Sequence, residues 1–201
     1  MLYSGVNIFG QLSELYLKSR DDFIKATSTP STQTASEAPE GSSEGSIGLS
    51  SSVLQIFKKL QKRDPVTKVK AFQELDVYLN ALEADSDELT SLLTFFLYHF
   101  CRILINESDK KVREAAHSTF AVFIKRDKRK LGPHIKKIFP LWVCSFFDPS
   151  PEAAKQAKDN FDAAFPKNRQ SAVFLLAYKN FLHFANEQLR QSEDSVASES
   201  K

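Results

Sequence analysis

Glycine, cysteine and long apolar runs are all scarce in this 201-residue chain. Three of its six glycines, Gly41, Gly45 and Gly48, lie in one polar stretch, so a glycine-rich loop that cradles a nucleotide phosphate is not expected. Two cysteines are too few for a disulfide framework or a four-ligand zinc site. Because Cys101 and Cys144 fall within apolar helical patterns, we predict that both are buried thiols.

Apolar runs are short, and the run from Leu92 to Leu97 is among the longest. None reaches the roughly 20 residues that a helix needs to cross a bilayer. The N-terminus also lacks a basic and then apolar segment with a small-residue cleavage site, so a secretory signal is not expected. The sequence therefore predicts a soluble protein of the cytosol or nucleus with no membrane partner.

Catalytic chemistry has little support. No His or Cys pair has metal-ligand spacing, and no strand, turn and helix pattern presents a nucleophilic serine. We expect the chain on its own to be no enzyme and to hold no cofactor, and each histidine to be partly exposed or hydrogen-bonded. The histidines lie on four different predicted helices and are His99, His117, His134 and His183.

Helical patterns fill most of the chain, and 42% apolar residues with 17 Phe are enough for a core. Asp64 can accept hydrogen bonds from the free amides of the next turn, and Pro65 suits the first helical position. Serines are expected to cap the helices that begin near Ser51 and after Ser86. Pro140 is expected to kink or divide its helix.

Composition divides the chain into four parts. Residues 1–25 form an N-terminal arm whose pattern permits one short helix, and residues 26–50 form a flexible linker because they have almost nothing to bury. Residues 51–190 form the helical domain, with a central helix around residues 89–104 and a last helix from about residue 169. Residues 191–201 are predicted to be a disordered tail or the start of a further linker.

Helix pairs recur at a spacing near 40 residues. Asp64, Asp109 and Asp148 each lie at a turn between two helices, 45 and 39 residues apart. Such a period is typical of HEAT repeats, in which each pair buries its apolar face by stacking on its neighbours. We therefore predict an all-α, HEAT-like or armadillo-like solenoid of about three helix pairs plus a terminal helix, with an irregular helical bundle as the alternative. The recurring apolar register is Ala71 with Leu75, Ala116 with Phe120, and Ala157 with Phe161.

Positive charge is concentrated in the middle of the chain. Residues 53–137 contain 17 basic and 11 acidic side chains, whereas acidic side chains outnumber basic ones on either side. Stacked helix pairs would gather these cations at two opposite edges. The first edge would carry Lys62, Arg63, Lys68, Lys110, Lys111 and Arg113. The second would carry Lys125, Arg126, Lys128, Arg129 and Lys130, with His134, Lys136 and Lys137 beyond them.

Clusters of this kind attract phosphates through charge and counterion release, without reading bases. For any single residue, however, a solvated helix face is the simpler interpretation. Arg113 is expected to pair with a turn carboxylate, Asp64 or Asp109, rather than with a ligand. Four acidic residues are expected beside the second cluster and would neutralise part of it: Glu83, Asp85, Asp87 and Glu88.

Four blocks of the sequence carry a family resemblance. They run Lys59 to Leu75, Asp109 to His117, Leu131 to Trp142 and Ala154 to Pro166. In this order they resemble the N-terminal region of listerin, a family of large E3 ubiquitin ligases that act in ribosome-associated quality control. The resemblance covers about residues 53–166, and the first 50 residues match only loosely.

The resemblance implies a HEAT-like domain that helps to seat the ligase on a large ribosomal subunit blocked by peptidyl-tRNA. Contacts there would be to rRNA or ribosomal proteins, beside the partner that senses the tRNA and extends the nascent chain. It also implies that the catalytic RING, with its zinc ions, belongs to another part of the parent protein. We expect a cytosolic monomer. The alternative is a protein-only scaffold that grips a partner helix through an apolar groove or through the arm around Ile8 and Phe9.

Overall fold

The computed structural model describes residues 49–83 and 87–199, and within these ranges every regular element is helical. The all-α prediction is therefore confirmed for this part of the chain. The arm with Ile8 and Phe9, the linker up to residue 48, and Ser86 lie outside the described residues. The α-helices are α2 (Ser51–Leu60), α3 (Pro65–Ala81), α4 (Asp87–Asn106), α5 (Lys110–Asp127), α6 (Ile135–Cys144), α7 (Pro151–Ala164) and α8 (Lys167–Glu199). Two 3₁₀ segments, η1 (Lys128–His134) and η2 (Ser145–Phe147), flank α6.

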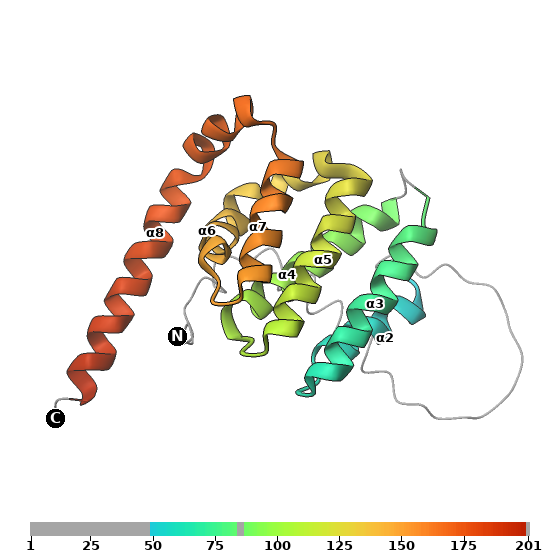
Figure 1. Cartoon of the computed structure of the whole chain (residues 1–201), viewed down its shortest axis with the longest axis horizontal. Helices are drawn as coiled ribbons and strands as arrows, with labels where there is room; N and C mark the ends of the chain where they lie inside the picture. Colours follow the sequence, from blue (N-terminus) through green and yellow to red (C-terminus); the bar gives the residue numbers. More distant parts are fainter. Residues whose placement is uncertain (1–48, 84–86, 200–201) are drawn as a thin grey trace, which may run out of the picture.

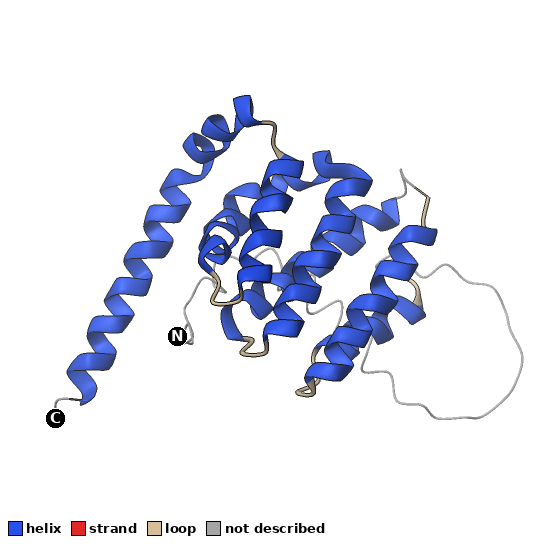
Figure 2. Cartoon of the chain, in the orientation of Figure 1, coloured by secondary structure: helices blue, strands red, loops and turns tan. Residues whose placement is uncertain are grey.

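The helices are arranged in two layers (Figure 1). Helix α5 lies between α3 and α7 in one layer, whereas α6 contacts both α4 and α8 in the other. Helix α2 packs against α3. The turns α2–α3, α4–α5 and α6–α7 all lie at the lower edge of the view in Figure 2, and we call this edge the turn edge.

Helix caps explain where α3 and α5 begin. Asp64 accepts a hydrogen bond from the Thr67 amide at 2.8 Å, and Asp109 accepts from the Lys111 amide at 2.8 Å. At the third turn Ser150 occupies the N-cap of α7, and its hydroxyl accepts from the Ala153 amide. Asp148 instead accepts from the Ser150 amide at 2.7 Å and holds the turn that leads into the helix.

With Ser150 as the third N-cap, helices α3, α5 and α7 have the same spacing between the cap and their buried residues. An alanine follows seven residues after each cap and a large apolar side chain eleven residues after it. All six are buried, so the same two positions of α3, α5 and α7 face the core. These residues are Ala71 and Leu75 in α3, Ala116 and Phe120 in α5, and Ala157 and Phe161 in α7.

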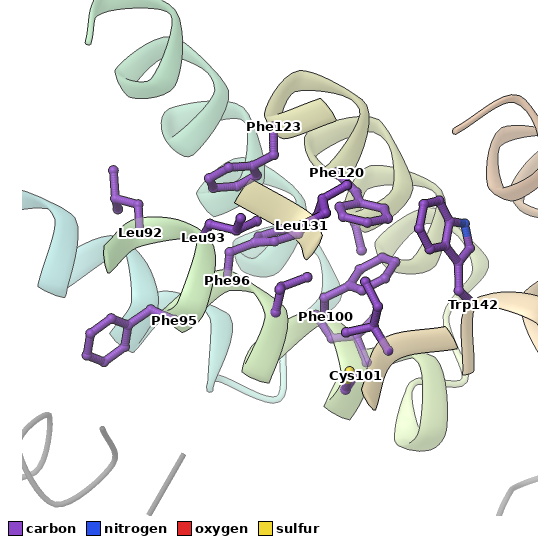
Figure 3. Packing of buried hydrophobic residues seen from close by; sticks show 14 of the residues in the cluster. Leu92, Leu93, Phe95, Phe96, Phe100, Cys101, Phe120, Phe123, Leu131 and Trp142 are labelled. Atoms are coloured by element: carbon purple, nitrogen blue, oxygen red, sulfur yellow. The ribbon is translucent and has the colours of Figure 1, made fainter. Parts of the chain in front are cut away.

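Helix α4 is the central helix, as predicted, because most of its side chains are buried. Figure 3 shows Phe96 and Phe100 of α4 beside Phe120 and Phe123 of α5, with Trp142 of α6 next to Phe120. By length and composition α4 could also cross a membrane, contrary to the prediction from its apolar runs, but 61% of its apolar window is buried within the domain. Its hydrophobicity is that of a core helix.

Two local predictions need correction, and a third is narrowed to one of its alternatives. Ser50 occupies the N-cap of α2, but its hydroxyl makes no capping bond and lies 2.9 Å from the Ser52 hydroxyl. Of the two alternatives predicted for Pro140, a kinked or a divided helix, the second is excluded, because α6 continues through Pro140, which is buried inside it. Helix α8 continues to Glu199, past the predicted end at Arg190, because residues 191–199 contain neither Gly nor Pro to stop it.

Candidate nucleic-acid interface

Ion pairs link each turn of the turn edge to the next: one joins α3 to the α4–α5 turn, and the other joins α5 to the α6–α7 turn. Lys68, four residues after the cap Asp64, pairs with Glu107, two residues before the next cap. Arg113, four residues after Asp109, pairs in the same way with Asp148, two residues before Ser150. The side chains of both pairs are no more than 15% exposed. We call this repeated arrangement the ion-pair ladder.

The Arg113–Asp148 pair is the more elaborate rung of the ladder. Arg113 Nε donates to Asp148 Oδ2 at 2.7 Å and Nη2 donates to Oδ1 at 2.9 Å, while Nη1 reaches the backbone carbonyls of Glu107 and Ser108. The prediction that Arg113 pairs with a turn carboxylate is right in kind but wrong in partner, because the carboxylate belongs to the following turn rather than to Asp64 or Asp109.

Burial alone would raise the pKa of Asp148, but hydrogen bonds from Arg113 and from the Ser150 amide outweigh it and lower this pKa below its ordinary value. The hydrogen bond to Asp148 correspondingly raises the pKa of Arg113. Both groups are therefore charged at neutral pH, and each charge is neutralised by the other.

Other cations of the turn edge face solvent. Lys62, Arg63 and Lys110 are exposed, and Lys111 keeps 70% of its side chain exposed although its Nζ lies 2.9 Å from Glu114 Oε2. That hydrogen bond raises the pKa of Lys111. We call these four residues the exposed cations of the turn edge. Lys68, predicted to belong with them, is instead largely enclosed by its pair with Glu107.

The opposite edge carries the second basic cluster, and intramolecular contacts occupy much of it. Arg126 donates to the Leu82 carbonyl, and Lys130 Nζ lies 2.8 Å from Thr90 Oγ1. Arg129, with 83% of its side chain exposed, donates to Asp127 at 3.0 Å. Lys128 Nζ approaches the Ala163 carbonyl at 3.4 Å. Asp127, which was not among the four acidic residues predicted for that role, pairs with Arg129. Of those four, Asp85 lies outside the described residues.

An open groove with a volume of about 650 Å³ lies within the second cluster. It runs between the end of α5, the start of η1 and the end of α7, and Lys125, Arg126, Lys128, Arg129 and Asn160 contribute to its walls. Lys125 is exposed beside it. The groove offers cations to an anionic ligand, but most of them already contact the protein.

The two remaining predicted cations follow η1. Lys136 is exposed, whereas Lys137 is half-buried and burial lowers its pKa. His134, at the end of η1, is also half-buried, and burial lowers its pKa.

Two histidines of the described residues, His99 and His117, are buried. Burial lowers the pKa of His99 to about 3 and that of His117 to about 4, so both rings are neutral at pH 7. His117 contradicts the expectation of an exposed or hydrogen-bonded ring, because it is fully buried and neither ring nitrogen has a hydrogen-bond partner. Cys101 is buried as predicted, whereas Cys144 is only half-buried. Among the described residues, no group of three or more His, Cys, Asp or Glu side chains is placed to hold a metal ion.

Sequence reasoning missed two features of the turn edge. The spacing of a basic and an acidic residue relative to the caps signals the ion-pair ladder, but only once Ser150 is recognised as the third cap. The other feature is Phe147 of η2, whose side chain is 82% exposed. Helical spacing carries the signal, because Phe146 follows Trp142 by four residues, on the face predicted to be buried, and Phe147 falls outside that face.

The chain is similar to known proteins over most of its length. Residues 49–201 match the family model of the listerin N-terminal domain, described as E3 ubiquitin-protein ligase listerin, N-terminal domain. Listerin of Mus musculus is 36% identical over 115 residues, which cover 57% of this chain and 6% of that protein. Listerin of Gallus gallus is 27% identical over 192 residues, which cover 94% of this chain and 11% of that protein.

A third relative is listerin of Drosophila melanogaster, 29% identical over 136 residues that cover 67% of this chain and 8% of that protein. The chain thus spans about a tenth or less of the length of these relatives. No solved structure matches it significantly.

Proposed function

Because the chain belongs to the listerin family and carries its N-terminal domain, we propose that it docks the ligase on stalled large ribosomal subunits. The parent protein would ubiquitinate the nascent chain on these subunits and so mark it for the proteasome. Ubiquitin transfer and its zinc-binding RING belong, in this proposal, to other parts of the parent, and this domain needs no cofactor.

The observation that carries the proposal is the contrast within the turn edge. The carboxylates of Glu107 and Asp148 lie in largely buried ion pairs. The exposed cations of the turn edge, by contrast, face solvent. The edge also carries the carboxylates of Asp64, Asp109, Glu114 and Glu152, and each of them accepts an intramolecular hydrogen bond. The four exposed cations therefore remain available to an anionic partner. A positive strip on a rigid helical scaffold suits rRNA phosphates.

We further propose that the two layers form a HEAT-like solenoid. The pairs would be α2 with α3, α4 with α5, and α6 with α7, and α8 would be the terminal helix. The shared register after the three caps and the ion-pair ladder support this interpretation, because both recur from one pair to the next. In the cell the domain would act as a cytosolic monomer, next to the factor that senses peptidyl-tRNA and extends the nascent chain.

Co-sedimentation with purified large subunits tests the docking proposal. Reversing the exposed cations of the turn edge in one variant (Lys62→Glu, Arg63→Glu, Lys110→Glu, Lys111→Glu) is expected to weaken binding at least tenfold. The loss of binding with rising salt should also become less steep in this variant, because fewer counterions are released. Circular dichroism should show an unchanged thermal transition, since these side chains are exposed.

A matched control reverses four cations of the other edge (Lys125→Glu, Lys128→Glu, Arg129→Glu, Lys136→Glu). We expect a smaller loss, because Lys128 and Arg129 already contact the Ala163 carbonyl and Asp127. If reversing the turn edge leaves co-sedimentation unchanged, electrostatic docking through that edge is wrong. Deleting residues 1–48 separates the alternative, in which the arm grips a protein partner, because that deletion would then abolish binding while charge reversal would not.

A further inference from the structure

The most exposed large apolar side chain of the described residues is Phe147, with 82% of its surface accessible. It ends η2, in the turn between α6 and α7. The preceding Phe146 points the other way and packs against Phe161 of α7, with ring centroids 5.6 Å apart. Phe146 therefore packs against the core, whereas Phe147 faces solvent for a reason that packing does not explain.

Three contacts fix the turn that carries Phe147 against the first turns of α5. Asp148 is held by Arg113 through two hydrogen bonds. The Ser150 hydroxyl lies 2.9 Å from Glu114 Oε1, and the other oxygen of Glu114 accepts from Lys111 Nζ at 2.9 Å. The residues that directly follow Phe147 are thus fixed against α5, the helix that carries Lys110 and Lys111.

Two of the carboxylates near the ring are paired, and two lysines beside them are exposed; Glu152, in the first turn of α7, is exposed and accepts a hydrogen bond from Gln156. Asp148, the carboxylate adjacent to Phe147, is neutralised by Arg113, and Glu114 is engaged by Lys111 and Ser150. The hydrogen bond from Lys111 lowers the pKa of Glu114. Lys110 and Lys111 remain directed to solvent on the neighbouring turn. An exposed aromatic face beside exposed cations is the combination that binds single-stranded nucleic acid, in which bases stack on rings and phosphates meet lysines.

We infer that Phe147 stacks on an unpaired base of RNA whose backbone phosphates contact Lys110 and Lys111. This inference rests on the proposed function and names the part of the RNA that the turn edge takes: a loop or bulge rather than a continuous duplex. Bases within a duplex are stacked on each other and offer no free face to the ring. An apolar protein pocket is the less suitable partner, because the residues next to Phe147 and on the neighbouring turn include Ser108, Asp148 and Lys110.

Fluorescence anisotropy with two RNA probes tests the inference on the 201-residue chain. One probe is a hairpin with a loop of unpaired nucleotides, and the other is a blunt duplex with the same number of phosphates. Phe147→Ala is expected to weaken binding of the hairpin about tenfold and to leave binding of the duplex unchanged. Phe147→Trp should restore hairpin binding. Leu175→Ala, which removes a similarly exposed apolar side chain from α8, should change neither.

The outcomes separate this inference from the proposed function. Equal losses for hairpin and duplex, or no loss for either, would overturn base stacking by Phe147. A loss for intact large subunits without any loss for the RNA probes would assign Phe147 to a protein contact and would also overturn it. If charge reversal of the turn edge abolishes co-sedimentation while Phe147→Ala changes nothing, the docking proposal stands and only the stacking inference fails.

Discussion

Arg113 of α5 and Asp148 of the α6–α7 turn, 35 residues apart in the sequence, are joined by two hydrogen bonds that use both carboxylate oxygens. The two side chains are only 11% and 7% exposed. A two-bonded pair of this kind fixes the angle and the distance between its elements at once. It therefore sets how the last helix pair seats on the one before it.

Replacing Asp148 by Asn is expected to lower the free energy of unfolding by about 2 to 3 kcal/mol, because it leaves the charge of Arg113 largely buried without its partner. Urea unfolding at pH 7, followed by circular dichroism, measures this change. Asp159→Asn is the matched control, because its pair with Lys155 leaves both side chains more than 60% exposed and should be worth about 0.5 kcal/mol or less. Equal losses for the two variants would contradict the structural role given to Asp148.

The same pair predicts a pH dependence. Since the pKa of Asp148 is lowered in the folded protein, its contribution to stability is complete above the unfolded pKa, near 3.9, and is lost as the pH falls toward the folded pKa. Between pH 5 and pH 3 the wild-type chain should therefore lose more stability than Asp148→Asn. Urea midpoints across this range measure the difference, and parallel curves would show that Asp148 does not titrate differently in the folded state.

His117 predicts a second pH dependence at higher pH. Its folded pKa of about 4 lies below the unfolded value near 6.5, so the unfolded chain binds more protons between these values and stability falls as the pH is lowered. His117→Phe removes this titration while keeping an aromatic ring against Phe100. The slope of unfolding free energy against pH between 6.5 and 5 should become smaller in the variant. An unchanged slope would mean that His117 is protonated as readily in the folded state.

Among the aromatic residues of α6, Trp142 is expected to cause the largest loss of unfolding free energy when its side chain is replaced by a smaller one. Its Nε1 donates to the Ala157 carbonyl at 3.0 Å, and its ring contacts Phe120 and Phe161. Trp142→Phe leaves the buried carbonyl without that donor and opens space beside it, so we expect a loss of about 2 to 3 kcal/mol. Circular dichroism in urea is the suitable measurement, because this variant removes the one Trp of the chain. A loss below about 0.5 kcal/mol would show that the site collapses or recruits water.

Lys62 and Lys68 should separate structural from docking cations. Lys68→Met is expected to lower stability by about 1 to 2 kcal/mol, because Glu107 keeps only 9% exposure and would lose its cation. Lys62→Met should change stability by less than about 0.5 kcal/mol, because Lys62 is exposed. Thermal unfolding of both variants makes the comparison, and a reversed order would contradict the assignment of Lys68 to the ladder.

Local chemistry explains which parts of the fold could be predicted from the sequence. Asp64 with Pro65, and Asp109 ahead of an apolar helical pattern, mark helix starts within a few residues, so the turns at both were predicted correctly. The segment Asp148-Pro149-Ser150-Pro151 offers two capping residues in four positions. Composition cannot decide between them, because the choice depends on whether Asp148 is needed by Arg113.

Long-range partners and side-chain direction account for most of what was not predicted. The carboxylate that meets Arg113 depends on how the helix pairs stack, and the two expected partners, Asp64 and Asp109, lie in the wrong turns. Helical spacing from Trp142 indicates that Phe146, rather than Phe147, turns inward, but it does not show how far Phe147 projects into solvent. For the basic clusters, the sequence located the cations but could not separate Lys68, which is paired and enclosed, from Lys62, which is exposed.

The ion-pair ladder also specifies the order of the helix pairs. At its two positions, two residues before and four residues after the cap, the first pair has Lys62 and Lys68, the second Glu107 and Arg113, and the third Asp148 and Ala154. The first helix pair has cations at both positions, so it can supply the cation of an ion pair but not the carboxylate. The third has a carboxylate and an alanine, so it can supply the carboxylate but not the cation. Exchanging the pairs would set cation against cation or leave an enclosed carboxylate unmatched. These few charges therefore distinguish the three turns from one another and favour the order in which they occur.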